Sequence, residues 1–359
     1  MTAKSFGPRF GVWALVPGAW ASFHHPEDPV DASWERVKRQ ILAAEKQGYD
    51  ATLIAQHTIN PSGENFDYLE AWATAAALAS ITSEIELITA IKPFLSHPVV
   101  LAKQALAIEE ISGGRFSLNI VNGWFKPEAE RSGIPFYDHD ERYAYGEEWL
   151  TAVKQLISGE KTSLKGKYFN IDGIRLAPKS RVRERPGLYV GGESEPARDL
   201  VAKLADVYFI NGQPVADVVA LIEDARRRRA SGPALRFGLS AFVIARPTEA
   251  EALDELDRAW EIAKADQAAF AELYGNADTK ATMFETFKRN PHIGTNGGTA
   301  AGLVGSYDQV VERIAAFHDL GIELFMLQFQ PFEREQQRFA EQIIPRVRQL
   351  YKEKSVVAG

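Results

Sequence analysis

The repeated alternation of short strand-like and longer helix-like segments is the feature that most constrains the fold of this chain. Its clearest instance begins with Ile85–Ile91, an apolar run rich in β-branched residues. Apolar residues then recur at helical spacing over Pro98–Ile111, and Gly113 and Gly114 end that helix because glycine adopts the left-handed turn at little cost. Arg115–Val121 is a second strand. Because a helix joins the two strands, they are predicted to run parallel.

Eight such strand-then-helix units can be counted along the 359 residues. The predicted strands are Phe10–Val16, Ala51–Ala55, Ile85–Ile91, Arg115–Val121, Leu188–Val190, Val207–Ile210, Phe237–Ala245 and Leu324–Leu327. This alternation predicts an α/β fold, a (β/α)8 TIM barrel with insertions, formed by residues 1–359 as one domain. An open, doubly wound sheet is the alternative. The barrel is favoured because no G-x-G-x-x-G sequence follows the first strand and no P-loop sequence is present.

Two segments interrupt the alternation. Lys165–Leu176 has the pattern of a small hairpin, whereas residues 265–300 are polar and contain Gly, Asn and Pro. Long irregular segments in compact domains are often lids or binding loops. We therefore expect a mobile insertion at 265–300, and a lid and a disordered or purely structural excursion are equally open interpretations of it.

The composition excludes several classes of site and partner. The chain has no cysteine, so disulfides, thiolate nucleophiles and cysteine-based metal sites are excluded, and no H-E-x-x-H sequence indicates a metal. The net charge of −7 gives no reason to expect nucleic acid or an acidic membrane as a partner. No apolar stretch approaches the roughly 18 residues of a membrane span, and the polar N-terminus does not resemble a signal peptide. We expect a cytoplasmic protein.

The residues that directly follow the predicted strands are expected to form the active site, because the carboxyl ends of parallel barrel strands bear ligands. They are aromatic, amidic and poor in charge, and include Trp20, Gln56, Asn122 and Trp124. The rim has no facing pair of carboxylates, so glycoside hydrolysis is not expected. The sequence also lacks G-x-S-x-G, the motif of a serine nucleophile. Such a rim suits a planar aromatic cofactor that carries the reactivity itself.

Two features of this rim each have two interpretations. Gly191–Ser194 precedes a predicted helix, where backbone N–H groups could hold a phosphate, but many ordinary strand-to-helix turns also contain glycine. His57 follows the second predicted strand, where it is either a general acid or base or a hydrogen-bonded loop histidine.

Four segments resemble the bacterial-luciferase-like flavin monooxygenases. They are S-G-G-R-F-S-L-N-I-V-N-G-W-F-K-P-E (Ser112–Glu128), D-H-D-E-R-Y (Asp138–Tyr143), L-Y-V-G-G-E-S (Leu188–Ser194) and G-L-V-G-S-Y-D-Q-V-V-E-R-I (Gly302–Ile314). The resemblance is greatest to the branch of alkanesulfonate, dimethyl-sulfone and pyrimidine-ring monooxygenases. It implies a (β/α)8 barrel that oxygenates a small organic substrate with O2 and reduced FMN (FMNH2). It also implies a separate NAD(P)H-dependent FMN reductase as a partner, and a homodimer or homotetramer.

The resemblance further implies roles for individual residues. The implied FMN contacts are Ala55, Gln56, Ala90, Asn119, Glu128, Arg142, Tyr143, Gly192 and Ser194. Among them, Arg142, Tyr143 and Ser194 would hold the ribityl phosphate, since an anion requires guanidinium and hydroxyl donors. The implied catalytic residues are His57, Asn122 and Trp124.

The class of substrate is indicated by departures from the alkanesulfonate enzymes. Those enzymes have Arg-x-His on a late strand, Arg before the Gly-Gly of the mobile loop and Tyr-Pro-His near the final strand. Here the corresponding positions hold Ser240-Ala241-Phe242, Asn296 and Gln330-Pro331-Phe332. Burying a sulfonate without cationic donors is costly, so an uncharged or weakly polar substrate, a sulfone above all, is predicted. The candidate substrate contacts are Trp20, His25, Phe242, Asn296 and Gln330.

Three other interpretations stay open at this point. His24, His25 or Lys92 could replace the missing cations, which would allow an alkanesulfonate. A nitrogen heterocycle, opened by the same machinery, fits Asn119 and Glu128 equally well. The third interpretation is a relative that binds flavin or the deazaflavin F420 without acting as an oxygenase.

Overall fold

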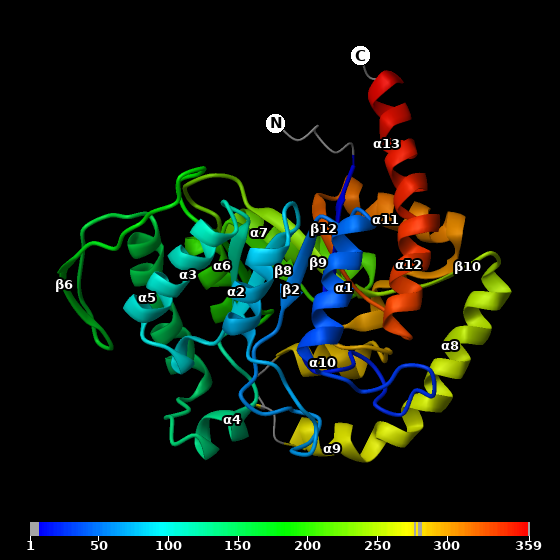
Figure 1. Cartoon of the computed structure of the whole chain (residues 1–359), viewed down its shortest axis with the longest axis horizontal. Coiled ribbons are helices and arrows are strands. Elements are labelled where there is room, and N and C mark those ends of the chain that lie inside the picture. The colour runs from blue at the N-terminus through cyan, green and yellow to red at the C-terminus, as the bar shows by residue number, and fades with distance from the viewer. Residues whose placement is uncertain (1–6, 276–277, 279–281, 358–359) are drawn as a thin grey trace.

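A closed barrel of eight parallel strands forms the centre of the protein (Figure 1). The computed structural model describes residues 7–275, 278 and 282–357. In chain order the barrel strands are β1 (Arg9–Trp13), β2 (Ala51–Ile54), β3 (Glu86–Ile91), β4 (Phe116–Ile120), β7 (Gly187–Gly191), β8 (Val207–Ile210), β9 (Arg236–Phe242) and β12 (Ile322–Gln328). The last strand, β12, pairs with β1 in parallel and closes the ring. The predicted barrel and its eight strands are therefore confirmed, and the open sheet is excluded.

Helices cover the outside of this barrel, as in the alternating pattern predicted from the sequence (Figure 1). They are α1 (Trp34–Lys46), α2 (Ala71–Ile81), α3 (Pro98–Ile111), α5 (His139–Ile157), α6 (Glu195–Leu204), α7 (Val215–Arg228), α11 (Tyr307–Asp319), α12 (Phe332–Gln342) and α13 (Ile344–Val357). Helix α3 has the predicted bounds: its N-cap His97 accepts a hydrogen bond from the Val99 N–H at 3.3 Å. Its far end is followed by Gly113 and Gly114, both at positive φ.

Two predicted elements are each divided in the structure. The predicted closing helix Phe332–Leu350 is two helices, α12 and α13, because the chain bends at Ile343 and Pro345 lacks the N–H that would continue the first helix. The predicted strand Phe237–Ala245 divides at Val243 into β9 and β10 (Ile244–Arg246). Outside the barrel, β10 pairs with β11 (Val304–Ser306).

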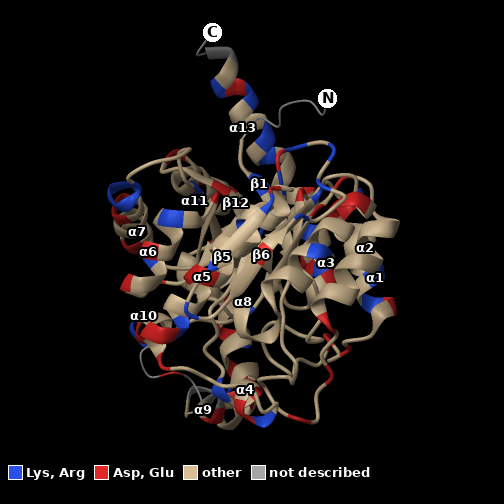
Figure 2. Cartoon of the chain, turned by 90° about the vertical axis from the view of Figure 1, so that its left-hand side faces the viewer, with Lys and Arg blue, Asp and Glu red and all other residues tan. Residues whose placement is uncertain are grey.

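Charged side chains lie mainly on the helices and loops, where lysine and arginine alternate with aspartate and glutamate over the face seen in Figure 2. The barrel strands carry few charges, and strand side chains such as Phe10, Leu118 and Tyr208 pack with apolar side chains of the helices in the main core. The hairpin predicted over Lys165–Leu176 is present as the antiparallel pair β5 (Thr162–Lys165) and β6 (Asn170–Ile174), and its first strand begins three residues earlier than predicted. Among the helices of the described residues, none combines the length and the apolar character that crossing a membrane requires.

The expected insertion at 265–300 contains helices rather than irregular chain. Helix α8 (Glu249–Ala263) continues through a 3-10 turn, Lys264–Asp266, into α9 (Gln267–Gly275), and α10 (Thr282–Arg289) and a second turn, Gly298–Ala301, follow. Residues 276–277 and 279–281 of this segment lie outside the described residues. Figure 1 shows α9 and α10, with the short α4 (Lys126–Arg131), at the end of the barrel opposite the chain termini.

Asp266 joins this insertion to the loop that follows β1. Its buried carboxylate accepts hydrogen bonds from the Ser22 hydroxyl and the Phe23 N–H, and lies 2.7 Å from His24 Nδ1. We therefore expect Asp266→Ala to loosen the insertion while the barrel stays folded, at a cost of about 1.5–3 kcal/mol for a charged hydrogen bond. Hydrogen exchange should accelerate in α9 and α10 and stay unchanged in the barrel strands.

The matched control for this prediction is Asp257→Ala, which removes an exposed carboxylate from α8. It should leave hydrogen exchange in α9 and α10 as in the wild type, since exposed charges contribute little. Equal exchange rates for Asp266→Ala and the wild type would show that this contact does not fix the insertion.

Candidate active site

A cavity of about 260 Å³ lies where the carboxyl ends of the barrel strands meet the insertion. Most of the residues singled out from the sequence line it together, although they come from separate strands and loops. These are Trp20, Ala55, Gln56, His57, Ala90, Asn119, Asn122, Trp124, Arg142, Tyr143, Gly192, Ser194 and Asn296. Within the described residues, no group of three or more His, Cys, Asp or Glu side chains could hold a metal ion.

Three expected substrate contacts do not line this cavity. The side-chain amide of Gln330 instead holds the backbone of Ser22, donating to its carbonyl at 2.7 Å and accepting from its N–H at 3.1 Å. Phe242 is fully buried in a small apolar cluster with Ile244. The ring nitrogen Nδ1 of His25 accepts the Glu27 N–H at 3.2 Å. All three residues therefore support the loops around the cavity instead of forming its wall.

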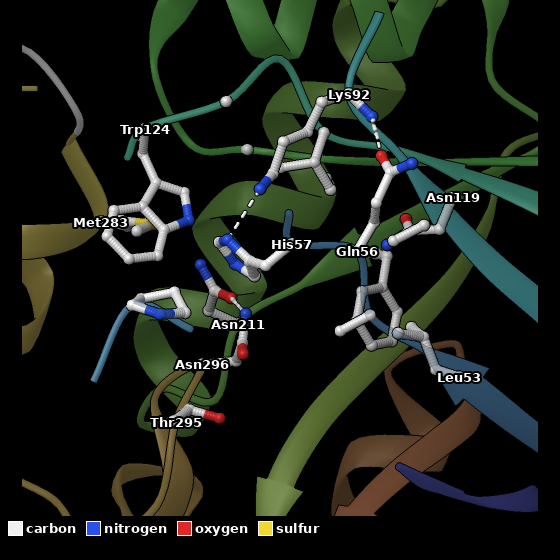
Figure 3. Close-up of a pocket in the computed structure, with 18 of the residues that line it drawn as sticks. Leu53, Gln56, His57, Lys92, Asn119, Trp124, Asn211, Met283, Thr295 and Asn296 are labelled. Atoms are coloured by element: carbon white, nitrogen blue, oxygen red, sulfur yellow. Dashed lines mark hydrogen bonds between the residues drawn. The ribbon is translucent and has the colours of Figure 1, made fainter. Parts of the chain in front are cut away.

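Glu128, expected as an FMN contact, also lies outside the cavity wall. Its carboxylate is fully buried on α4, where it forms an ion pair with the Lys92 ammonium and accepts the Thr58 N–H at 2.5 Å. The second close neighbour of this ammonium is His57 Nδ1, at 2.8 Å (Figure 3). Nδ1 of His57 is in turn 3.6 Å from the carboxylate, too far for a hydrogen bond. Glu128 thus stands behind His57, which does line the cavity.

Burial and charge shift the pKa values of all three groups. Burial, reinforced by the Lys92 charge, lowers the pKa of His57 to about 4, so its imidazole is neutral at pH 7. Burial lowers the pKa of Lys92 to about 8, against the opposing effect of Glu128. For Glu128, burial raises the pKa, but the neighbouring His57 and Lys92 outweigh it and bring the value to about 2.

One end of the cavity has the features of a phosphate site. Gly192 has a φ of 125°, and a side chain there would lie 3.1 Å from the Tyr143 hydroxyl and 2.7 Å from Ala197 Cβ, so only glycine fits. Ser194 caps α6 without a side-chain capping bond. Within the described part of the chain, Ser194 Oγ is a buried polar atom with no hydrogen-bond partner. An anion at this helix N-terminus would satisfy it.

Arg142 borders the same end but is partly engaged already. Its guanidinium donates to the Tyr137 carbonyl at 2.8 Å, forms an ion pair with Asp278 and lies 4.2 Å from the Phe136 ring centre. Its Nε has no hydrogen-bond partner among the residues that the structure describes. The Nε–H of Arg142 is therefore left for an anionic ligand.

The middle of the cavity has small residues and unpaired amides. The small side chains of Ala55 and Ala90 line the cavity, together with the amides of Asn119 and Asn122. Across the described ranges, Asn119 Oδ1 and both polar atoms of Asn122 are buried without hydrogen-bond partners. A planar ring system with several ring nitrogens and carbonyl oxygens would fit such a wall, because buried polar atoms need partners.

The far wall of the cavity is aromatic and comes largely from the insertion. Trp124 lies 5.9 Å from the His57 ring and 5.6 Å from Phe284 of α10, and Figure 3 shows Met283 beside it. Phe287, one helical turn on, also lines the cavity. Sequence reasoning missed these residues because it treated the segment as irregular, although the spacing of Met283, Phe284 and Phe287 is that of one helix face.

Glu193 is a buried carboxylate between the strand ends and the insertion. It accepts hydrogen bonds from Asn211 at 2.9 Å, Gln213 at 3.0 Å and the Thr286 hydroxyl of α10 at 2.9 Å. Asn211 in turn accepts from Asn296 at 3.2 Å. Burial raises the pKa of the Glu193 carboxyl. These contacts hold α10 and Asn296 over the cavity.

The fold and the cavity together define a (β/α)8-barrel enzyme with a site for a planar, phosphate-bearing cofactor at the carboxyl ends of its strands. Residues 14–324 match the model of the luciferase-like monooxygenase family, to which this chain belongs.

Relatives of known function share this family. An FMNH2-dependent dimethylsulfone monooxygenase of Pseudomonas putida is 33% identical over 96% of this chain and 97% of its own length. A second, from Pseudomonas fluorescens (strain Pf0-1), is 32% identical over 95% of each chain. Among solved structures, a long-chain alkane monooxygenase superposes with a TM-score of 0.79 at 20% identity, over 97% of this chain and 92% of the other.

Proposed function

We propose that this enzyme is an FMNH2- and O2-dependent monooxygenase that oxygenates a small organosulfur compound, a sulfone such as dimethyl sulfone, with cleavage of a C–S bond. The two Pseudomonas relatives, both dimethylsulfone monooxygenases, support this proposal. Reduced FMN supplies the two electrons with which one oxygen atom of O2 enters the substrate and the other leaves as water.

The observation that carries the choice of substrate is the charge of the cavity wall. As far as the structure describes the chain, its lysine and arginine residues are Lys92 and Arg142, and each is paired with a carboxylate. Of the three described histidines that line the cavity, His57 is neutral at pH 7, burial lowers the pKa of His292, and His139 Nδ1 lies 3.0 Å from the Asp140 carboxylate. No unpaired cation therefore compensates a sulfonate, whereas a neutral sulfone requires only hydrogen-bond donors.

The chain's own residues would bind the cofactor in a consistent order along the cavity. Ser194, Tyr143 and the free Nε of Arg142 would hold the phosphate at the N-terminus of α6. Ala55, Ala90 and Asn119 would contact the ring system, and Gln56 is fixed for this by accepting the Lys92 N–H at 2.8 Å. The aromatic wall, with Trp20 and Trp124, would exclude water from the substrate end.

The test of this proposal is a substrate comparison. The enzyme, a generic NAD(P)H-dependent FMN reductase and O2 are expected to convert dimethyl sulfone into methanesulfinate and formaldehyde, with one oxygen of O2 in the formaldehyde and one in water. Methanesulfonate should give at least about tenfold less product, the effect of about 1.4 kcal/mol of uncompensated charge. Rapid turnover of methanesulfonate with none of dimethyl sulfone would reject the proposal.

Two other activities are distinguished by the same assay. Ring opening of a nitrogen heterocycle would appear as loss of ultraviolet absorbance when uracil replaces the sulfone. A relative that uses F420 would bind the deazaflavin tightly and release no oxygenated product. The unpaired amides of Asn119 and Asn122 favour the heterocycle as the second candidate, since they could also bind ring amides.

The proposal also includes a partner protein and self-association of the enzyme. A separate NAD(P)H-dependent FMN reductase supplies the reduced cofactor, in the cytoplasm, and the enzyme forms a homodimer or homotetramer. Self-association is supported by apolar side chains on the outer surface of two neighbouring helices. Val100 and Ile111 of α3 are 55% and 52% exposed, and Ile81 of α2 is 37% exposed.

A further inference from the structure

The contact between Lys92 and His57 restricts what the histidine can do. An ammonium group has N–H donors and no lone pair, so His57 Nδ1, 2.8 Å away, must be the acceptor. An imidazole that accepts through Nδ1 is neutral and carries its proton on Nε2. The Lys92 ammonium is itself held by the Glu128 carboxylate, and the side chains of both residues are at most 4% exposed.

We propose that Lys92 is a positioning residue that holds His57 as the neutral Nε2–H tautomer, so that His57 offers the cavity a hydrogen-bond donor and accepts no proton from it. The tautomer is inferred from the geometry of the free enzyme. Only its use in catalysis rests on the function proposed above. A fixed donor can stabilise negative charge that develops on an oxygen atom in a dry cavity.

The groups around His57 support this assignment. Lys92 approaches from the end of β3 and Glu128 from α4. The Tyr68 ring lies 5.4 Å away, and burial raises the pKa of its hydroxyl, so it stays protonated and uncharged. Trp124 and Phe125, at 5.9 and 6.1 Å, carry no charge. Lys92 is therefore the group that keeps the Glu128 carboxylate from accepting a hydrogen bond from His57 Nδ1–H.

Removing Lys92 should reverse the tautomer. In Lys92→Met the Glu128 carboxylate, 3.6 Å from Nδ1 in the wild type, becomes the partner of His57. Nδ1 then becomes a donor, and the carboxylate favours the charged imidazolium. The pKa of His57 should rise from about 4 in the wild type to above the ordinary value of about 6.5.

The experiment is nitrogen NMR of 15N-histidine-labelled enzyme without flavin or substrate, in which the spectrum of His57→Asn identifies the His57 signals among seven histidines. The wild type should show the Nε2–H tautomer and stay neutral down to about pH 5. Lys126→Met, which removes an exposed lysine of α4, should match the wild type. A wild-type Nδ1–H tautomer, or titration near pH 6.5, would overturn the proposal.

The wild-type spectrum alone decides the tautomer, even if Lys92→Met does not fold. If Lys92→Met folds and keeps the wild-type tautomer and pKa, Lys92 does not position His57. Because the measurement uses neither FMN nor substrate, its outcome is independent of the substrate comparison. In turnover assays, Lys92→Met should show a lower kcat, with a new pH dependence below about pH 7, and an unchanged KM.

Discussion

The free energy of unfolding of the Glu128→Gln variant is expected to be about 3–5 kcal/mol lower than that of the wild type. The substitution keeps the shape of the side chain but leaves the Lys92 ammonium buried without its countercharge. The Thr58 N–H also loses a charged acceptor. Urea denaturation at pH 7, followed by circular dichroism, measures the difference.

The matched control is Glu130→Gln, on the same helix. Glu130 forms an ion pair with Lys126 at 3.0 Å, but both side chains are more than half exposed. Such a pair contributes about 0–1 kcal/mol, so the control should unfold almost as the wild type does. Equal stabilities of the two variants would show that the pair behind His57 is solvated, contrary to the structure.

The contribution of the Glu128 carboxylate should also appear in the pH dependence of the free energy of unfolding. The pKa of Glu128 is lowered to about 2 in the folded protein, from an ordinary value of about 4.3. Its stabilising contribution is therefore complete above the ordinary value and is lost as the pH falls towards 2. Between these limits the wild type should lose stability more steeply than Glu128→Gln. Parallel curves would contradict the lowered pKa.

The second large effect is expected at the phosphate end of the cavity. Ser194→Ala should weaken binding of reduced FMN by about tenfold or more, since a hydrogen bond to a charged group contributes about 1.5–3 kcal/mol. It should leave the affinity for reduced riboflavin, which lacks the phosphate, unchanged. Anaerobic titration of both flavins measures the two affinities. Folding should not suffer, because Ser194 makes no side-chain capping bond.

Ser62→Ala is the matched control for this substitution. Ser62 lines the same cavity from the loop after β2, away from the N-terminus of α6. The control should bind both flavins as the wild type does. Equal losses of FMN and riboflavin affinity in Ser194→Ala would place the phosphate elsewhere.

Local sequence patterns predicted the barrel because each unit is encoded within a short stretch. Pro98, Gly113 and Gly114 set the ends of α3, and apolar periodicity set its length, without reference to the rest of the chain. The carboxyl ends of parallel barrel strands all lie at one end of the barrel, so most of the residues that follow the strands meet in one cavity. One failure lies where a pattern is long and polar, in α10, whose aromatic face the loop-like composition of the segment concealed.

The sequence by itself determined the (β/α)8 architecture and the family, because helix and strand periods, turn residues and the four resembling segments are all local. Only the tertiary structure decided which polar residues face the ligand and which support it. Lys92 meets His57 and Glu128 across 35 and 36 residues of sequence, and Gln330 meets Ser22 across 308. Such contacts form when the barrel closes, and burial and the neighbouring charges then shift the pKa values of His57, Lys92 and Glu128.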